Sequence, residues 1–459
     1  MARFGQLAPG GGVAAESAPV GRPHALKSHE HVCLLGAALD GGDLGVTAQT
    51  LALIHLIRTY NPGARISLLI EHPSPEPQVA RVGGQTVSVE VVNGRLEMKR
   101  PVWDHLLFLP LLALFHRVCR RFGWLQEKPS RSRWIETLKQ ASWLGELQGG
   151  EGFSDERGLR DFFSGCLPTL AAISFGRPPY LLPQSYGPHG TTVGLMLARF
   201  VARRCRGLFA RDLASVQVGI TLAGRFPAPP VEFCPDLAFA LPAGDLTSDA
   251  IEPALPAGAP VFGLNVNGRM YNDGFAKTPS LNLKLDYTGL MPELARALLE
   301  SDPQARLLLI PHMVAPPGHP ENDREACEHV AAALPEALRT RVHLLRELAD
   351  PCAVKSAIGR CDFFVGSRLH ACIAALSQEI PCVAIGDSWR VEGVFASAGM
   401  QASVIDARYD EAAAALRFVL QQARERAQQR ERLAEALAPV RERLLDVFSR
   451  LFAPSRRPF

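Results

Sequence analysis

The stretch Asp362-Phe363-Phe364-Val365-Gly366-Ser367-Arg368-Leu369-His370-Ala371 combines an apolar run, a glycine and a polar helix start. Residues 362–365 predict a buried strand, Gly366 a turn, and Ser367 the N-cap of a helix that continues through 371–377. A strand that leads through a tight turn into a helix is the basic unit of α/β folds. Because free backbone N–H groups and the helix dipole attract anions at such a turn, we predict an anion site here that includes Gly366 and Ser367.

Two side chains of this stretch suit the chemistry of a small anion. Arg368 offers a planar fork that matches a carboxylate or phosphate, and His370 titrates near neutral pH and can deliver or accept a proton. For an isolated Arg-Leu-His sequence, a structural explanation would be preferred, in which the arginine caps a neighbouring strand and the histidine lies in the core. The surrounding strand, turn and helix reverse that preference, so we predict Arg368 and His370 as catalytic residues.

Short apolar runs alternate with longer helical patterns along most of the 459 residues. This alternation predicts an α/β fold of βαβ units, doubled into two Rossmann-like domains that face a cleft. The expected organisation is a disordered tail at 1–28, an N-terminal domain at 29–240, a linker rich in Pro, Ala, Gly and Asp at 241–260, a C-terminal domain at 261–405, and C-terminal helices with a basic tail at 406–459. The arginine-rich C-terminal helices are expected to be a solvated face.

An insertion is expected in the N-terminal domain at about residues 84–100. Residues 86–92 and 95–99 alternate in polarity around Asn93-Gly94, which is a strong hairpin signal. We therefore predict a β-hairpin that projects from the domain, either as a lid or, with somewhat more weight, as a surface elaboration.

Polar and glycine-rich segments follow several predicted strands, at the sheet edge where ligands bind in open α/β folds. We predict donor contacts from Arg368, Arg211, Ser367, Gly366, Gln184, Ser185 and His312, with Arg211 also catalytic, and acceptor contacts from Asp43, Gly42, Asp155, Ser154 and Asn267. On spacing alone, Arg211 is equally well an ion-pair partner of Asp212. His312 is equally well an anchor for its own loop.

Composition narrows the function further. A formal charge of +3 is too small to indicate nucleic acid as a partner, and the ten cysteines form no C-x-x-C pair, so they predict buried thiols in a reducing cytoplasm. The glycine turns match neither a dinucleotide fingerprint nor a P-loop, and no His/Asp/Glu group has metal spacing. The apolar run at 106–115 is too short to span a bilayer and predicts a buried helix, with shallow membrane contact as the alternative.

Taken in order, these segments resemble the polysaccharide pyruvyl transferase family. The resemblance covers roughly residues 31–400 and rests on residues 36–45, 149–155, 183–188, 210–215, 235–239, 310–312, 366–371 and 380–386. It implies a fold like the two-domain GT-B glycosyltransferases, phosphoenolpyruvate as donor and co-substrate, no further cofactor, and a ketal-linked pyruvate on a saccharide as product. It also implies that Arg368, His370 and Arg211 contact the donor.

The chain departs from commoner family members in ways that concern the acceptor. Asp40-Gly41-Gly42-Asp43 stands where an Asn-containing glycine turn is usual, and Asp387-Ser388-Trp389-Arg390 replaces a Tyr- and Lys-containing stretch. The expected acceptor is a sugar of a bacterial-type polysaccharide or of its lipid-linked precursor. A lipid-linked acceptor would place a cytoplasmic enzyme at the inner face of the membrane.

A mechanism follows from these expectations. Phosphoenolpyruvate carries a phosphate and a carboxylate, so Arg368 and Arg211 would bind it from opposite domains while His370 protonates its methylene carbon. Asp43, Asp155 and His312 are equal candidates for accepting the hydroxyl proton. The rival functions are a nucleotide-sugar glycosyltransferase of the same fold and a non-catalytic glycan-binding relative.

Overall fold

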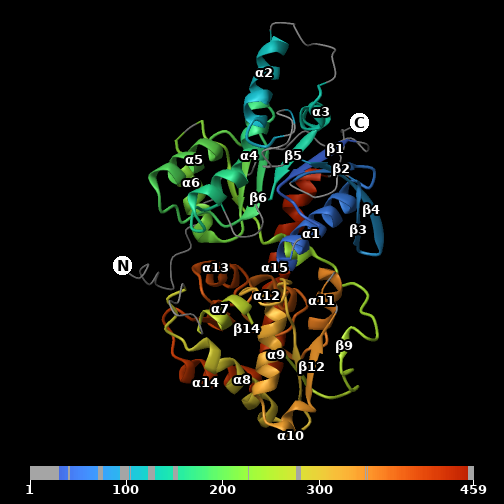
Figure 1. The fold of residues 1–459 in the computed structure, drawn as a ribbon, viewed down its shortest axis with the longest axis vertical. Coiled ribbons are helices and arrows are strands. Elements are labelled where there is room, and N and C mark those ends of the chain that lie inside the picture. Colours follow the sequence, from blue (N-terminus) through green and yellow to red (C-terminus); the bar gives the residue numbers. More distant parts are fainter. Residues whose placement is uncertain are drawn as a thin grey trace.

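The computed structural model describes residues 30–39, 42–70, 76–93, 103, 105–121, 130–147, 153–225, 227–274, 281–346, 348 and 350–452. Figure 1 shows two α/β lobes stacked end to end, one built mainly from the first half of the chain and one from the second. The tail predicted at 1–28 and the last residues, 453–459, lie outside the described part.

Within the described residues the first sheet has eight strands in the order β3-β4-β2-β1-β5-β6-β7-β8. Every pairing in it is parallel except that of β3 with β4. The strands are β1 (His31–Leu35), β2 (Arg65–Ile70), β3 (Gln78–Val82), β4 (Gln85–Asn93), β5 (Trp143–Glu146), β6 (Tyr180–Gln184), β7 (Gly207–Ala210) and β8 (Val231–Phe233).

Helices cover both faces of this sheet because its strands are apolar on both sides. Val32 and Leu34 face the core that contains α1 (Leu44–Tyr60), whereas Cys33 and Leu35 face the opposite core. That opposite side is covered by α2 (Leu109–Arg121), α3 (Arg133–Gln140), α4 (Leu159–Phe175), α5 (Thr192–Ala202) and α6 (Leu213–Ala223). A 3₁₀ turn, η2 (Leu237–Ala240), follows β8.

The structure describes a β-hairpin that precedes the predicted one in the sequence. Strands β3 and β4 form an antiparallel hairpin that turns at Gly83-Gly84, where both glycines have positive φ. β4 also pairs in parallel with β2, so this hairpin extends the main sheet and does not project from it. The strand predicted at 86–92 is present as β4, whereas its predicted partner, 95–99, lies outside the described residues, so the turn at Asn93-Gly94 stays a prediction.

The second sheet has seven described strands in the order β15-β14-β13-β10-β11-β12-β9. They are β9 (Ile251–Glu252), β10 (Val261–Leu264), β11 (Arg306–Leu309), β12 (Val342–Leu345), β13 (Phe363–Gly366), β14 (Cys382–Gly386) and β15 (Val404–Asp406). All pairings are parallel except that of β9 with β12. Because β9 lies inside the stretch predicted as linker, that stretch also supplies an edge strand to the second sheet.

Helices cover both faces of the second sheet as well. One face packs against α7 (Gly268–Asp273), α8 (Tyr287–Ser301), α9 (Asp323–Ala333) and α14 (Ala412–Arg424). The other packs against α11 (Pro351–Ile358), α12 (Leu369–Leu376) and α13 (Trp389–Ser397). Two short helices, α10 (Glu336–Arg339) and η3 (Gln401–Ser403), complete the domain. The predicted fold class, two Rossmann-like α/β domains, is confirmed.

One hydrophobic core continues from the first domain into the second. It joins α1 to α11 and α12, and it includes the apolar face of α15 (Arg426–Phe452). Figure 1 shows α15 crossing back to the first domain. There, the ring centroids of Phe452 and Trp143 lie 4.8 Å apart, and Arg443 and Arg450 bind buried Glu232. The solvated face expected for these helices is thus limited to the outer sides of α14 and α15.

In the part of the chain that is described, no helix has the length and apolarity that a membrane span requires. All ten cysteines are buried free thiols.

Candidate active site at the domain junction

The two domains meet through backbone hydrogen bonds between two of the predicted loops. Val314 N donates to Gly42 O at 2.8 Å, and Leu44 N donates to His312 O at 3.4 Å, so Asp43 lies opposite Met313. Gly42 is required for this approach because a Cβ there would lie 2.3 Å from Val314 O. The loop after β1 is therefore fixed against the loop after β11.

The carboxylate of Asp236 connects the domains at this junction. Asp236 Oδ2 accepts hydrogen bonds from Gln49 and from Arg211 Nη1, each at 3.0 Å, and lies 3.7 Å from His370 Nε2 of the second domain. Asp236 Oδ1 accepts from Ala238 N at 2.9 Å. Burial alone would raise the pKa of Asp236, but the positive charges of His370 and Arg211 outweigh burial and hold that pKa well below its usual range.

Arg211 is fixed at the end of β7, with only 1% of its surface exposed. Its Nε donates to Ser185 Oγ at 2.9 Å, and Ser185 Oγ donates to Asp212 Oδ2 at 3.2 Å. Asp212 caps α6 by accepting from Ser215 N. The alternative of an Arg211–Asp212 ion pair is not observed, and Arg211 pairs with Asp236 instead. Among the described residues, Arg211 Nη2 has no hydrogen-bond partner.

Arg368 is held by a carboxylate of its own domain. Its Nε and Nη2 donate to Asp323, with the shortest contact 2.8 Å from Nη2 to Oδ1. Asp323 is fully buried and also accepts from the backbone N–H groups of Gly268, His312 and Met313. Burial would lower the pKa of the Arg368 guanidinium, but Asp323 raises it above its usual range. Arg368 Nη1 has no partner among the described residues.

The start of α12 differs in detail from the prediction. Arg368, not Ser367, occupies the N-cap position, and Asn265 Oδ1 accepts from Ser367 N at 3.1 Å and from Arg368 N at 2.8 Å. The Ser367 hydroxyl accepts from Tyr287 OH, which in turn accepts from Asn267 N. Two of the N–H groups predicted to bind an anion are therefore already occupied, because both donate to the side chain of Asn265, in the loop after β10.

Gly366 and Asn267 support this turn. Gly366 ends β13, and a Cβ on it would lie 2.6 Å from Cys372 Sγ. Asn267 caps α7 by accepting from Met270 N, and its amide donates to Ser367 O at 3.3 Å. Asn267 was predicted to contact an acceptor, and in this structure it is a buried partner of the donor-side turn.

His370 and His312 lie close together with Asp43. The His370 ring packs against Gly45, where a Cβ would lie 2.1 Å from Nδ1. Burial, assisted by the charges of His370 and Arg368, lowers the pKa of His312 well below its usual range, although Asp43 opposes the shift. His312 is therefore neutral near pH 7, and it does not add a cation to the site. Asp43 caps α1 by accepting from Gly45 N through Oδ1.

Asp155 and Ser154 have local partners. Asp155 accepts from Gly190 N, Thr191 N and the Thr191 hydroxyl, and these bonds hold the loop before α5. Burial would raise the pKa of Asp155, but these hydrogen bonds lower it. Ser154 donates to Pro188 O at 2.7 Å. Both residues are at the carboxyl edge of the first sheet, as predicted, but neither contacts the Asp236 network.

A buried acid accompanies Gln184. Glu146, at the end of β5, accepts from Gln184 Nε2 at 3.1 Å and is 2% exposed. Burial raises the pKa of Glu146 to about 8. The second carboxylate oxygen of Glu146 and the side-chain amide oxygen of Gln184 are buried and have no hydrogen-bond partner among the described atoms. Gln184 is thus tied to an acid that is protonated at neutral pH.

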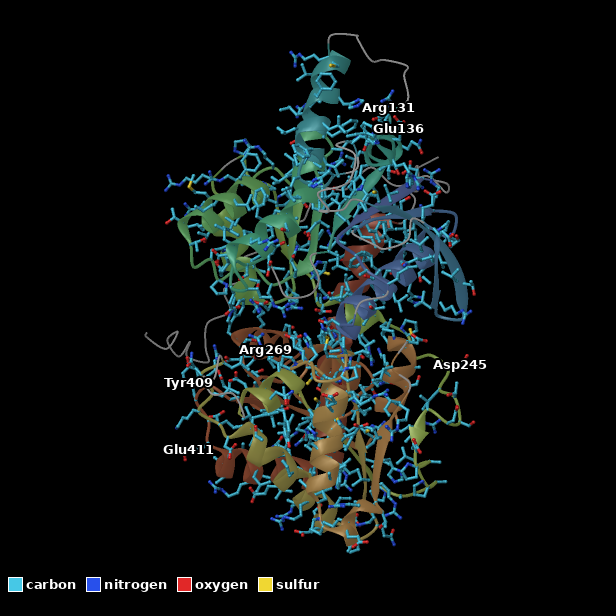
Figure 2. The ribbon with its side chains drawn as sticks, in the orientation of Figure 1. Arg131, Glu136, Asp245, Arg269, Tyr409 and Glu411 are labelled. Atoms are coloured by element: carbon cyan, nitrogen blue, oxygen red, sulfur yellow. The ribbon has the colours of Figure 1, made fainter. Side chains whose placement is uncertain are left out.

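Two more arginines of the second domain lie near the junction. Arg390 on α13 pairs with Glu156 of the first domain at 2.5 Å. Figure 2 shows Arg269, on α7, at the end of the second domain that faces the first. Arg390 and Glu156 thus form an ion pair between the two domains.

The junction therefore brings together Arg211, Ser185, Gly42, Asp43, His312, Arg368 and His370 from loops of both domains. Sequence reasoning missed Gln49, Asp236, Asn265 and Asp323, which hold these side chains. Asp236 stands within Pro235-Asp236-Leu237-Ala238-Phe239, directly after β8, so its place at a strand end was the available signal. Asp323 gave no such signal, because it opens a helix eleven residues after His312. The described residues contain no cluster of metal-ligating side chains.

Comparison with solved structures supports the fold. HepE of Anabaena in complex with UDP superposes with a TM-score of 0.50 at 13% identity, covering 92% of this chain and 98% of HepE. The UDP-forming α,α-trehalose-phosphate synthase of Burkholderia vietnamiensis gives a TM-score of 0.47 at 12% identity, covering 92% and 97%. The two parallel sheets and the likeness to HepE fit the predicted GT-B-like arrangement. No curated protein matches the sequence.

The family model of the polysaccharide pyruvyl transferases matches residues 145–388. This range includes Arg211, Asp236, Arg368 and His370 and omits Gly42 and Asp43. Since the match covers more than half of the 459 residues, the chain belongs to the polysaccharide pyruvyl transferase family.

Proposed function

We propose that this protein transfers the pyruvyl group of phosphoenolpyruvate to two hydroxyls of a saccharide, which forms a ketal and releases phosphate. The observation that carries the proposal is the contact of Asp236 with Arg211 from the first domain and with His370 from the second. These are two of the three residues that the family resemblance assigns to the donor. Their meeting at the junction supports a donor site there.

Two guanidinium groups supply the positive charge for a doubly anionic donor. Arg211 Nη2 and Arg368 Nη1 keep N–H groups without partners among the described residues, while the rest of each guanidinium is fixed by a carboxylate. A rigid arginine with free N–H groups suits a phosphate or carboxylate because the fork is already oriented. Asp236 and Asp323 thus position the two arms and leave their outer N–H groups for the donor.

His370 is the proposed proton donor. Asp236 holds negative charge 3.7 Å from Nε2, and Gly45 leaves the space that the ring occupies. A bound phosphoenolpyruvate adds two anions, and an imidazolium beside anions is electrostatically favoured. We assign Asp236 as a positioning residue for both His370 and Arg211, since it contacts each of them and is itself fully buried.

The chemistry then balances in two steps. His370 gives a proton to the methylene carbon of phosphoenolpyruvate, C2 becomes electrophilic, and a sugar hydroxyl adds to C2 while its proton passes to a base. The C2–O bond to phosphate breaks, and the second hydroxyl of the sugar adds to C2, with its proton leaving on the released phosphate. A methyl group, two C–O bonds and inorganic phosphate result. Holding the donor between domains aligns these partners.

Asp43 is the proposed base for the first hydroxyl. It lies at the junction beside His312, and its Oδ2 has no hydrogen-bond partner among the described residues, whereas Asp155 is fully engaged in its own loop. Asp43 would therefore contact the acceptor, as would Gly42. The acceptor remains a sugar of a polysaccharide or of its precursor.

Phosphate release tests this function. The wild type is incubated with phosphoenolpyruvate and a panel of pyranosides with free hydroxyl pairs, beside His370→Asn and a matched control, His329→Asn, which changes an exposed histidine of α9. We expect acceptor-dependent phosphate release by the wild type and the control, and a loss of at least ~100-fold in His370→Asn. Normal turnover by His370→Asn would contradict its role. Stabilisation by UDP- or GDP-sugars alone, without phosphate release from any acceptor, would favour a glycosyltransferase.

A further inference from the structure

Helix α2 packs on the first domain with only one of its sides. Leu109 and Ala113 are fully buried in the core shared with α4, which also contains Leu167 and Ala171. These buried contacts attach α2 to the first domain. Figure 1 shows α2 at the end of the first domain farthest from the second domain.

The opposite side of α2 is also apolar, and nothing in the described chain covers it. The exposed residues are spaced three or four apart along α2 and the turn before it, and their exposure ranges from 44% to 65%: Leu107, Phe108, Leu111, Leu114, Phe115 and Val118. We call this set the α2 face. A surface helix normally carries polar residues on its outer side, so a continuous apolar side of this size indicates a binding surface.

Most of the charges around the α2 face are positive, and Glu136 of α3 is engaged by Lys139 and Ser130. Residues 105–121 contain no Asp or Glu, and Arg117 and Arg121 are exposed on the helix. Arg131 lies over the exposed Trp103 ring at 5.6 Å from its centroid, and Figure 2 shows Arg131 at this same end of the domain. An apolar helix face that carries no acid of its own and is bordered mainly by arginines suits a surface that is apolar inside and anionic outside.

A neighbouring helix repeats the pattern. α4 packs against both α2 and α5, so the three helices form one layer. On α5, Val193, Met196 and Phe200 are 59%, 65% and 42% exposed. Residues 192–206 carry four arginines and no acid. The apolar and cationic character therefore extends over the helical layer and is not confined to one helix.

We propose that the α2 face docks this protein onto an anionic phospholipid bilayer, with α2 lying in the headgroup region. Its 13 residues extend roughly 20 Å, which is shorter than the hydrocarbon core, so α2 would lie along the surface and not cross it. A second copy of the chain fits less well. A two-fold contact through this face would bring the arginines of both copies together, and α2 itself has no carboxylate to pair them.

Vesicle co-sedimentation of the full chain tests the proposal. We expect binding to phosphatidylcholine vesicles that contain 30% phosphatidylglycerol, with little binding to pure phosphatidylcholine, and a marked loss at about 0.5 M NaCl. Leu111→Glu should lower the partition coefficient at least ~10-fold. The matched control is Val79→Glu, which places the same charge at a 59% exposed position on β3 and should bind like the wild type. Light scattering gives the oligomeric state of each variant.

Three results would overturn the proposal. The first is no binding of the wild type to anionic vesicles at 0.1 M NaCl, and the second is an equal loss in Leu111→Glu and Val79→Glu. The third is a wild-type dimer that Leu111→Glu converts to a monomer, because a second copy would then occupy the α2 face. Circular dichroism and thermal unfolding confirm that each variant is folded before it is compared.

Discussion

The imidazole of His370 stands so close to Gly45 that a Cβ on residue 45 would lie 2.1 Å from His370 Nδ1. Gly45 is in the first turn of α1, and His370 is in the first turn of α12. A helix of one domain therefore lacks a side chain at the point where the proposed proton donor of the other domain is seated.

Gly45→Ala should displace His370 without removing any functional group. We expect kcat/KM for phosphoenolpyruvate to fall by about 100-fold, because small misplacements of reacting groups have effects of that size. Gly190→Ala is the control, since its Cβ would meet only Asp155 Oδ1, at 3.9 Å. Steady-state phosphate release measures both variants. Full activity of Gly45→Ala would show that the position of the His370 ring against Gly45 does not affect catalysis.

Asp236 and Arg211 should depend strongly on each other for stability. Their side chains are at most 1% exposed and 3.0 Å apart, so removing Asp236 leaves Arg211 buried without a counter-charge, and removing Arg211 leaves Asp236 with His370 alone. We expect Asp236→Asn and Arg211→Gln each to lower the free energy of unfolding by ~3 kcal/mol or more. The double variant should lose less than the sum, with a coupling of ~1–3 kcal/mol in urea unfolding. Additive losses would show that the pair contributes nothing as a pair.

Arg368→Lys tests whether the fork of the arginine matters beyond its charge. A lysine keeps the positive charge but cannot bind Asp323 through two nitrogens and still offer a third to the donor. We expect affinity for phosphoenolpyruvate to fall by ~10-fold or more in isothermal titration. Arg296→Lys, which alters an exposed pair with Glu300, is the control. Equal affinities in the wild type and Arg368→Lys would show that only the positive charge of Arg368 contributes to binding.

Glu146 should make stability depend on pH. Folding raises the pKa of Glu146 from near 4.5 to about 8, so between these values the folded protein holds a proton that the unfolded chain has released. The contribution of Glu146 therefore becomes less favourable as pH rises through this window. Glu146→Gln keeps an acceptor for Gln184 and carries no charge, so it should be more stable than the wild type at pH 8, by on the order of 4 kcal/mol at most.

The Glu146 comparison is made by urea unfolding at pH 5 and pH 8. The variant and the wild type should differ little at pH 5 and diverge at pH 8. A difference that is the same at both values would mean that Glu146 is ionised throughout or that the amide acts through packing alone.

Much of the fold is predictable from the sequence because the strands of parallel sheets are continuous apolar runs. The runs at 31–36, 65–70, 207–210 and 342–345 coincide closely with β1, β2, β7 and β12. The strand at 86–92 was predicted, but its pairing with β3 through the turn at Gly83-Gly84 was missed, because Asn93-Gly94 is the stronger local hairpin signal. β9 has two residues and no alternating pattern, so it was not visible in the sequence.

The site was predictable only in part, for a related reason. Residues that meet at strand ends share an edge, and this locates Arg211, His312, Arg368 and His370. Their hydrogen-bond and ion-pair partners depend on how the two domains pack against each other. The local sequence pattern does not encode that packing. Asp236 contacts His370 only once α1 packs against α12. The same packing places the His370 ring in the space left by the missing side chain of Gly45.

A crystal structure of the wild type with phosphoenolpyruvate tests the central claim most directly. We predict one molecule at the domain junction, its phosphate and carboxylate within hydrogen-bond distance of Arg211 Nη2 and Arg368 Nη1, and its methylene carbon facing the His370 ring. Phosphoenolpyruvate bound elsewhere at saturating concentration, or touching arginines of one domain only, would contradict the account.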